Sequence, residues 1–281
     1  MRRLIAALAL ALAACGGGGG GESSSPSSPP SPQVNEWLYG YFGVGSPEQI
    51  VRTSAHVSFV HVMDWGDWDS TEGREAIKQQ QIAYMQEARA RGVKSFVVTV
   101  GFLAFDSQRH YRGSAQTITA VKAYLDQLAA LDLSRDVIAI YVLDEPDIDP
   151  PVDDRTMAQA FNDVRAAWPG PKLAVIYGDH GTPGIAAADW IGHDDYGRGA
   201  GVLDRMPAIR ADQRWIVVPG GADPWRQDPS PFVSRADSDP RIAVVMPFVF
   251  FDRKDERGVT FKGIGSNGML PQYEAAAAHA S

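Results

Sequence analysis

The sequence predicts an α/β domain built as a single (β/α)8 barrel, and three observations favour this fold. From Glu36 onward, short apolar runs alternate with longer amphipathic stretches, which is typical of repeated strand–helix units. One run, Val137 to Leu143, is apolar without interruption, as expected of a strand buried on both faces of a parallel sheet. The chain has 281 residues, and a barrel of about 250 residues fits that length.

The first residues have the pattern of an export signal. A positive start, Met1-Arg2-Arg3, is followed by the apolar segment Leu4 to Leu12 and then by the small residues Ala13-Ala14. Cys15, the only cysteine in the chain, comes next. This arrangement resembles the lipobox of bacterial lipoproteins. The resemblance implies cleavage before Cys15 and lipidation of its thiol; an ordinary secretory signal with an incidental cysteine is the alternative.

The lipoprotein resemblance also implies a location and a domain organisation. We expect the protein to lie in the bacterial cell envelope, held in the membrane by acyl chains on Cys15 and sorted to the outer membrane. Glycines followed by a Ser/Pro-rich run cannot bury apolar surface, so a disordered tether is predicted after the anchor. The expected units are a signal peptide (1–14), a tether (15–33) and a barrel domain (34–281).

Eight strands are expected along the barrel domain. Each is a short run rich in apolar and β-branched residues, bounded by polar or turn-forming residues. In chain order they are Trp37–Phe42, Val57–Met63, Lys94–Val100, Val137–Leu143, Leu173–Tyr177, Asp189–Gly192, Trp215–Val218 and Ile242–Pro247.

Helices are expected between these strands wherever apolar residues recur at helical spacing. The predicted helices are Thr71 to Arg91, Ala115 to Leu133, Thr156 to Trp168 and, after the last strand, Pro271 to Ala280. Between the fifth and sixth strands, Gly178 to Ala188 leaves room for only one short helix.

Composition and motifs exclude several classes of function. The net charge is -8 and no basic cluster follows Arg2-Arg3, which argues against nucleic-acid binding. No Gly-x-Gly-x-x-Gly turn follows the first strand and no phosphate-binding loop ends in Lys-Ser or Lys-Thr, so we expect no cofactor. No Gly-x-Ser-x-Gly motif is present either. We expect a monomer.

Histidine and aspartate residues after the fifth and sixth strands raise the question of a metal site. Asp179 and His180 follow one strand, and His193, Asp194 and Asp195 follow the next. Imidazole and carboxylate groups on adjacent loops suit a divalent ion. No His-x-His or His-Glu-x-x-His spacing occurs, however, so we predict no metal.

The residues that follow the predicted strands are acidic and aromatic. In a barrel they gather at the carboxyl-terminal rim, where active sites lie. Aromatic faces stack on sugar rings, and carboxylates bind hydroxyl groups and transfer protons, so we expect a carbohydrate substrate. The predicted substrate-binding residues are Asp64, Trp65, Asp144, Tyr177, Tyr196, Trp225, Phe248 and Phe250.

The end of the fourth strand, Asp144-Glu145-Pro146, resembles the Asn-Glu-Pro acid/base strand of glycoside hydrolase (β/α)8 barrels. The eighth strand, Val244 to Phe251, is similar to the aromatic-ended last strand of these enzymes. The resemblance implies that Glu145 is the proton donor to the glycosidic oxygen. Asp144 would then be a structural or Glu145-orienting group, on the opposite side of the pleat if the strand is regular.

The chain departs from the glycoside hydrolase pattern at the seventh strand. That strand runs into Pro219-Gly220-Gly221, and no acid follows before Asp223, so the glutamate nucleophile that the resemblance would place there is missing. A non-catalytic barrel that binds glycan or cell-wall polymer is therefore the competing hypothesis. If the protein is a hydrolase, the candidates for the second group are Asp194 or Asp195 after the sixth strand, Asp179 after the fifth, or an N-acetyl group of the substrate supported by Tyr196.

Overall fold

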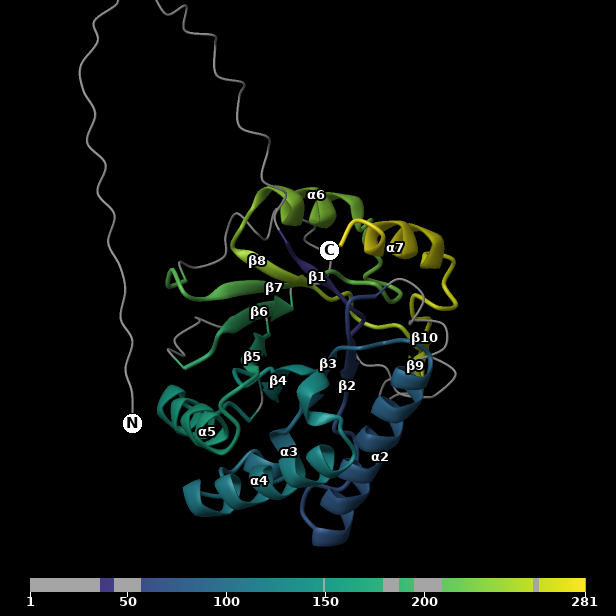
Figure 1. Ribbon diagram of the computed structural model, residues 1–281. Coiled ribbons are helices and arrows are strands. Elements are labelled where there is room, and N and C mark those ends of the chain that lie inside the picture. Colours follow the sequence, from purple (N-terminus) through teal and green to yellow (C-terminus); the bar gives the residue numbers. More distant parts are fainter. Residues whose placement is uncertain are drawn as a thin grey trace, which may run out of the picture. The chain divides into compact units, whose positions relative to one another are not determined.

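The computed structural model describes residues 36–42, 57–148, 150–178, 187–194, 209–254 and 258–280 (Figure 1). All of them belong to the compact unit from Val34 to Ser281. Among these described residues, no helix combines the length and the apolar character needed to cross a bilayer.

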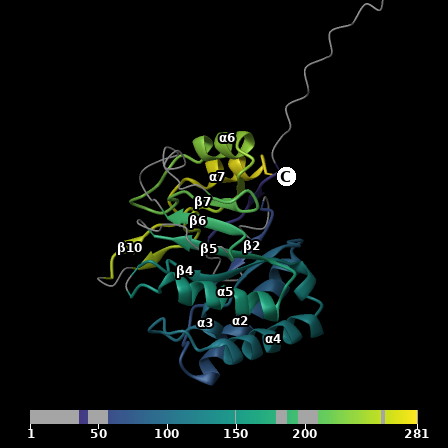
Figure 2. The ribbon, with the colours of Figure 1, turned by 90° about the vertical axis from the view of Figure 1, so that its left-hand side faces the viewer.

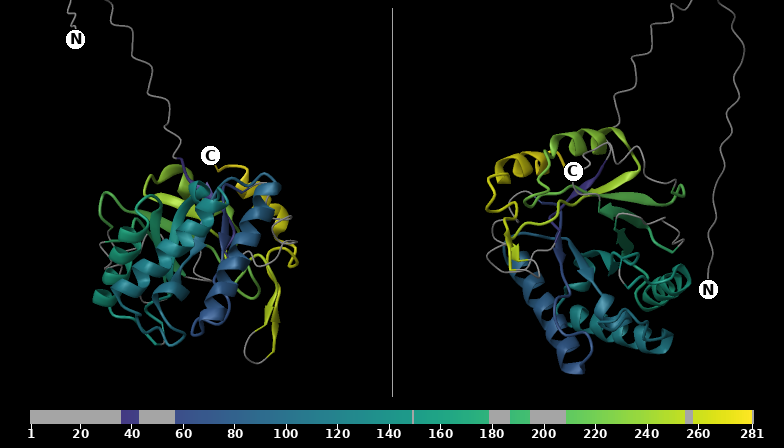
Figure 3. Two further views of the ribbon diagram at one scale, coloured as in Figure 1. Left: turned by 60° about the horizontal axis from the view of Figure 1, so that its bottom comes forward. Right: turned by 180° about the vertical axis from the view of Figure 1, so that it is seen from behind.

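One curled sheet of eight parallel strands forms the framework (Figures 1 and 3). The strand order is β1-β8-β7-β6-β5-β4-β3-β2, so that β3 to β7 each lie between their neighbours in sequence and β8 lies between β7 and β1. All eight predicted strands are confirmed in position; β1, β2, β3 and β8 are shorter than expected, and β4 to β7 are each one residue longer. Their bounds are β1 (Leu38–Tyr39), β2 (Val60–Val62), β3 (Phe96–Thr99), β4 (Val137–Asp144), β5 (Lys172–Tyr177), β6 (Trp190–Asp194), β7 (Arg214–Val218) and β8 (Ile242–Val245).

Helices cover the outer side of this sheet (Figures 1 and 2). Ser70 begins the longest one by accepting a hydrogen bond from the Gly73 N–H at 2.9 Å. The four predicted helices are confirmed, with ends shifted by a few residues. The helices are α2 (Thr71–Ala90), α3 (Gly101–Ala104), α4 (Ser114–Ala130), α5 (Asp154–Ala167), α6 (Ser230–Ser238) and α7 (Leu270–Ala277), with a 3₁₀ turn η1 (Ser134–Asp136).

Three elements were not predicted. They are the short helix α3, the nine-residue helix α6, and a hairpin of β9 (Arg253–Lys254) and β10 (Thr260–Phe261). The short helix expected from Gly178 to Ala188 falls almost entirely outside the described residues.

The buried apolar residues form two layers, one on each face of the sheet. The outer cluster packs strand residues such as Val60 and Val142 against helix residues such as Met85 and Phe161. The inner cluster is defined by strand and strand-end residues alone, and it therefore lies on the concave face away from the helices. Its members are Phe42, Phe59, Met63, Val97, Ala139, Tyr141, Ala174, Ile176, Trp190, Ile216, Val218, Ala243, Val244 and Met246.

Candidate active site

The carboxyl ends of β2, β4 and β6 carry four acidic residues, three of which act on one tyrosine. Asp64 follows β2, Asp144 ends β4 and is followed by Glu145, and Asp194 ends β6. The Tyr141 hydroxyl donates a hydrogen bond to Asp144 Oδ1 at 2.5 Å. Burial, together with the charges of Asp144, Asp194 and Glu145, raises the pKa of Tyr141 well above its ordinary value. The Tyr141 hydroxyl is therefore surrounded by carboxylates at the end of the inner cluster.

An irregularity in β4 turns Asp144 toward this cluster. The pairing of β4 with β5 shifts register between Tyr141 and Leu143. In a regular strand, residues three apart point to opposite faces, whereas here the Tyr141 hydroxyl reaches the Asp144 carboxylate. The strand is not regular at this point. The condition under which Asp144 was expected to lie on the opposite side of the pleat from Glu145 is therefore not met.

The backbone of Glu145 is held by neighbouring elements in an unusual conformation. Its φ is +42°, a left-handed value that costs a non-glycine residue on the order of 1–3 kcal/mol. Its N–H donates to the Ile176 carbonyl of β5 at 2.9 Å, and its own carbonyl accepts from the Ile148 N–H at 3.1 Å. The Arg109 guanidinium also donates to that carbonyl, at 2.7 Å. These bonds fix where the half-buried glutamate leaves the end of β4.

Asp64 is the most deeply enclosed of the four acids. Asp64 is only 5% exposed, and its Oδ2 has no hydrogen-bond partner among the described residues. Burial, and secondarily the charge of Asp144, raises the pKa of Asp64 to about 7, although backbone N–H groups of Asp64 and Phe102 act in the opposite direction. A carboxyl group of this kind is half-protonated near neutral pH.

A neutral aromatic layer lies beneath the acids. His61, on β2, is fully buried, and burial lowers its pKa to about 3, so its imidazole is uncharged. Its ring packs edge-on against Phe42 at 4.9 Å and Tyr141 at 5.2 Å between centroids. Phe248 joins this layer through Phe42, at 5.4 Å. His61 is thus a packing residue of the inner aromatic layer.

Asp194 lies on the same inner face as Tyr141. It is 6% exposed, and its alternate neighbours on β6 are the inner-cluster residue Trp190 and Gly192. A Cβ on Gly192 would touch Ile176 and Ile216 of the adjoining strands. The side chains of β6 at even-numbered positions therefore point into the concave face, and Asp194 is the last of them.

The predicted aromatic residues do not all reach the acids. Tyr177 and Phe250 lie in the outer cluster, on the helix side of the sheet. Tyr177 stacks on His193 at 5.8 Å, and burial followed by the charges of Asp154 and Asp147 raises its pKa. Phe250 packs against Tyr41 at 5.0 Å.

Trp65 and Trp225 are the most exposed of the predicted aromatic residues. Trp65, 47% exposed, meets Phe251 edge-on with centroids 4.9 Å apart. Trp225, 39% exposed, stacks on Phe261 of β10 at 5.6 Å with 28° between the ring planes. Each ring is thus partly exposed to solvent and packs against one phenylalanine, edge-on for Trp65 and stacked for Trp225.

Several predicted residues fall outside the part of the chain that the structure describes: Asp179, His180, Asp195, Tyr196 and the lipidation candidate Cys15. Their roles stay predictions. Within the described ranges, no group of three or more His, Cys, Asp or Glu side chains forms a metal site.

Tyr141 and Arg109 were not among the predicted site residues. Tyr141 stands inside an apolar run, yet its phenol must find a polar partner when buried, and that requirement was the available signal. Arg109 lies in the connection before α4, and nothing in its sequence surroundings points to Glu145.

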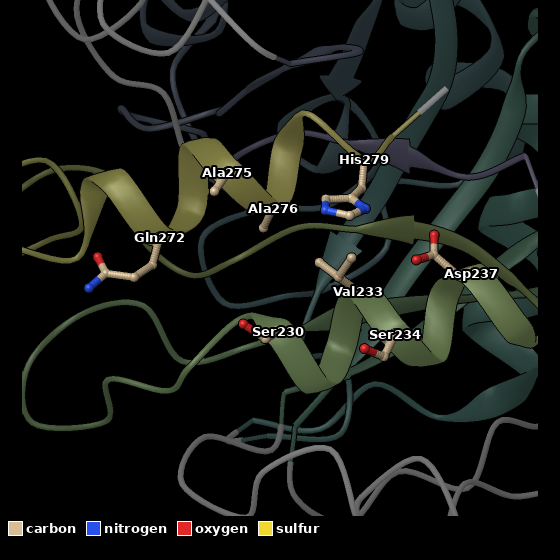
Figure 4. Close-up of a pocket in the computed structure, with 8 residues that line it drawn as sticks. All are labelled: Ser230, Val233, Ser234, Asp237, Gln272, Ala275, Ala276 and His279. Atoms are coloured by element: carbon tan, nitrogen blue, oxygen red, sulfur yellow. The ribbon is translucent and has the colours of Figure 1, made fainter.

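A separate hollow of about 280 Å³ lies between α6 and α7 (Figure 4). Asp237, which lines it, accepts a hydrogen bond at 2.9 Å from the Trp37 indole, just before β1. The hollow is therefore at the amino ends of the strands, whereas the acids are at the carboxyl ends. Its remaining lining residues are Ser230, Val233, Ser234, Gln272, Ala275, Ala276 and His279.

The fold is similar to that of several solved glycoside hydrolases. The first is a β-galacturonidase from Eisenbergiella tayi bound to galacturonate, with a TM-score of 0.57 and 8% identity over 88% of this chain and 52% of that one. An FMN-binding β-glucuronidase from Faecalibacterium prausnitzii gives a TM-score of 0.57 with 11% identity over 89% of this chain and 44% of that one. The β-glucuronidase of Ruminococcus gnavus gives 0.51 with 11% identity, over 80% and 45%.

This chain spans about half the length of these solved structures. Neither the models of known protein families nor the sequences of curated proteins match it. At such low identity the likeness concerns the fold: the described domain has a glycoside hydrolase-like α/β fold with acids at the carboxyl ends of its parallel strands.

Proposed function

We propose that this protein hydrolyses a glycosidic bond in an extracytoplasmic oligo- or polysaccharide, with Glu145 as the general acid. The observation that carries the proposal is the electrostatic grouping of Glu145, Asp144 and Asp194 around the Tyr141 hydroxyl. A general acid must stay protonated near the working pH, and neighbouring carboxylates favour the protonated form. The fixed backbone of Glu145 provides the defined position that proton transfer requires.

Asp194 is the partner that the geometry supports best. It ends β6, two strands from β4 in the sheet, and it lies on the same concave face. Its charge acts on Tyr141 together with that of Glu145. As a base it would activate water, and as a nucleophile it would form a glycosyl intermediate. Asp195, Asp179 and a substrate N-acetyl group supported by Tyr196 stay open as alternatives.

We also infer that the sheet closes into a (β/α)8 barrel. The inference is supported by contacts between its two edge strands: the Ser58 N–H, just before β2, donates to the Tyr39 carbonyl of β1 at 2.7 Å. The Tyr39 N–H donates in turn to Ser58 Oγ at 3.2 Å. Closure would surround the acids with all eight strand ends.

The sequence supports a location for this activity. Residues 1–14 would be removed, acyl chains on Cys15 would anchor the protein in the outer membrane, and residues 15–33 would hold the domain away from the bilayer. Labelled palmitate should be incorporated into the wild-type chain and not into Cys15→Ala. Incorporation in both would contradict the anchor.

A glycan-binding barrel without catalysis is the second candidate. It is favoured by the end of β7, where Pro219-Gly220-Gly221 supplies no carboxylate and Asp223 forms an ion pair with Arg226 at 3.0 Å. This candidate predicts binding of a glycan that persists without any release of reducing ends.

The deciding experiment compares Glu145→Gln with wild type on a panel of polysaccharides. The panel should include uronic acid-containing glycans, because two of the structural neighbours are a β-galacturonidase and a β-glucuronidase. We expect release of reducing ends by the wild type and a loss of about 10²- to 10⁴-fold in Glu145→Gln. Glu72→Gln, at an exposed position of α2, is the matched control. Equal turnover by Glu145→Gln and wild type would show that Glu145 is not the general acid.

A further inference from the structure

Asp64 combines two features that rarely occur together in a charged side chain. It is more than nine-tenths buried, and its Oδ2 has no hydrogen-bond partner among the described residues. An ionised carboxylate in that situation is costly, because neither water nor a donor solvates the second oxygen. The protonated acid avoids most of that cost.

The Asp64 carboxyl group is packed against the end of β4. A Cβ placed on Gly101 would lie 3.0 Å from Asp64 Oδ2 and 3.2 Å from the Val142 carbonyl oxygen. The two oxygens therefore flank the same point, next to the bulge that turns Asp144 inward. The backbone of Asp64 is fixed as well, since the Trp68 indole donates to its carbonyl at 2.8 Å. The carboxyl group thus has a defined place near Val142 of β4, where the charge of Asp144 acts on it.

The groups that face Asp64 come from several elements. From β4, Asp144 acts on it as a negative charge, with Tyr141 bonded to that same carboxylate. From α3, the Phe102 N–H donates to the Asp64 carboxyl group. His61, three residues earlier on β2, packs on Phe42 and Tyr141 and is neutral. The cations nearest along these loops, Arg74 and Arg112, donate to the Trp68 carbonyl, and the polar residue that α2 contributes here, Gln81, donates to the carbonyls of Met63 and Thr99.

We propose that Asp64 is a positioning residue that acts through Asp144: while the buried Asp64 carboxyl group is protonated, Asp144 carries the negative charge and retains the hydrogen bond from Tyr141. In this arrangement the pair holds one proton and one charge. When Asp64 releases its proton to solvent, two neighbouring carboxylates are both charged, and their repulsion weakens the Asp144–Tyr141 arrangement.

The proposal fixes a pH window. The pKa of Asp64 lies at about 7 in the folded chain, against an ordinary value of 3.8. Because the folded value is the higher one, the stabilisation that proton binding provides is complete below about pH 4. It is lost as the pH rises through about 7.

The test is a carboxyl ¹³C NMR titration of the full-length protein labelled at aspartate. We expect one resonance with a midpoint near pH 7 that is missing in Asp64→Asn, an uncharged substitute of nearly the same shape. In Asp144→Asn the midpoint should move down toward the ordinary range. An Asp64 midpoint near 4 in the wild type would overturn the proposal, and so would a midpoint that Asp144→Asn leaves unchanged.

Thermal unfolding provides a second measurement that needs no assignment of resonances. Between pH 5 and 8 the unfolding temperature of the wild type should fall relative to that of Asp64→Asn, whereas parallel profiles would contradict the proposal.

The effect on catalysis rests on the proposed function. The alkaline limb of the pH–activity profile, near pH 7, should move in Asp64→Asn, while a merely structural role would lower activity equally at every pH. Both titrations need no glycan, so they decide the role of Asp64 even if no glycan is cleaved.

Discussion

The ends of β4 and β7 differ in what they offer to a substrate. At β4, Asp144 accepts a hydrogen bond from Tyr141 of the inner cluster. The Glu145 backbone is held by its N–H, which donates to Ile176 of β5, and by its carbonyl, which accepts from the Arg109 guanidinium. At β7, the chain continues into Pro219-Gly220-Gly221, which has no functional side chain.

Backbone contacts take the place of side chains at the β7 end. The N–H groups of Gly221 and Ala222 both donate to the Phe248 carbonyl, at 2.5 and 3.1 Å, and the Phe248 N–H donates to the Pro219 carbonyl at 2.9 Å. This segment ties β7 to the residues after β8. Under the proposed function, this difference assigns the acid chemistry to the ends of β4 and β6 and leaves the β7 side to support and extend the site.

Replacing the acid at the end of β6 and the acid after β7 tests this contrast most directly. Asp194→Asn should lower turnover of a responsive glycan by about 10²-fold or more, because it removes the base or nucleophile from the inner face of β6. Asp223→Asn, the matched change after β7, should stay within about twofold, because its ion pair with Arg226 is partly exposed and such pairs contribute little. Initial rates of reducing-end release give both values. If Asp223→Asn lowered turnover more than Asp194→Asn, the second catalytic carboxylate would lie on the β7 side.

A glycine replacement in the segment after β7 should lower the stability of the protein. A Cβ on Gly220 would collide with the carbonyl oxygen of Trp225, and the Gly220 N–H already donates to Gln227 Oε1 at 2.6 Å. Gly220→Ala should therefore lower the free energy of unfolding by about 1–3 kcal/mol. Chemical denaturation measures it, with Gly170→Ala as the control because no atom lies within 4 Å of an added Cβ there. Equal stability of the two variants would show that the β7 segment adapts freely.

Removing the guanidinium that holds the β4 end should lower both activity and stability. Arg109 donates to the carbonyls of Glu145 and Ile148, at 2.7 and 3.0 Å. Arg109→Ala should lower kcat about tenfold by loosening the placement of Glu145, with KM nearly unchanged. The free energy of unfolding should fall by about 1–2 kcal/mol. Arg155→Ala, at an exposed position of α5, is the control, and a kcat equal to wild type in Arg109→Ala would remove Arg109 from the site.

The same contrast explains what the sequence could and could not predict. Apolar runs located all eight strands, and the fourth ended at Asp144 and Glu145 as the glycoside hydrolase resemblance implied. The direction of Asp144 could not be predicted, because it follows from a register shift between β4 and β5, which depends on two strands at once. Helix α6 was missed because its nine residues, beginning at Ser230-Pro231, carry too few apolar positions for a clear helical period.

Replacing Trp225, the exposed aromatic residue after β7, should have the smallest effect, and that effect should be on glycan binding alone. Trp225 stacks on Phe261 of the β9–β10 hairpin and is 39% exposed, so under the proposed function it can support a sugar ring beyond the acids. Trp225→Ala should weaken glycan binding by about fivefold, the equivalent of roughly 1 kcal/mol for one aromatic contact, and leave kcat unchanged. Val259→Ala, 51% exposed in the turn between β9 and β10, should change neither value. A kcat loss in Trp225→Ala as large as that of Asp194→Asn would mean that the β7 side takes part in bond cleavage, because an aromatic support beyond the acids acts only on binding.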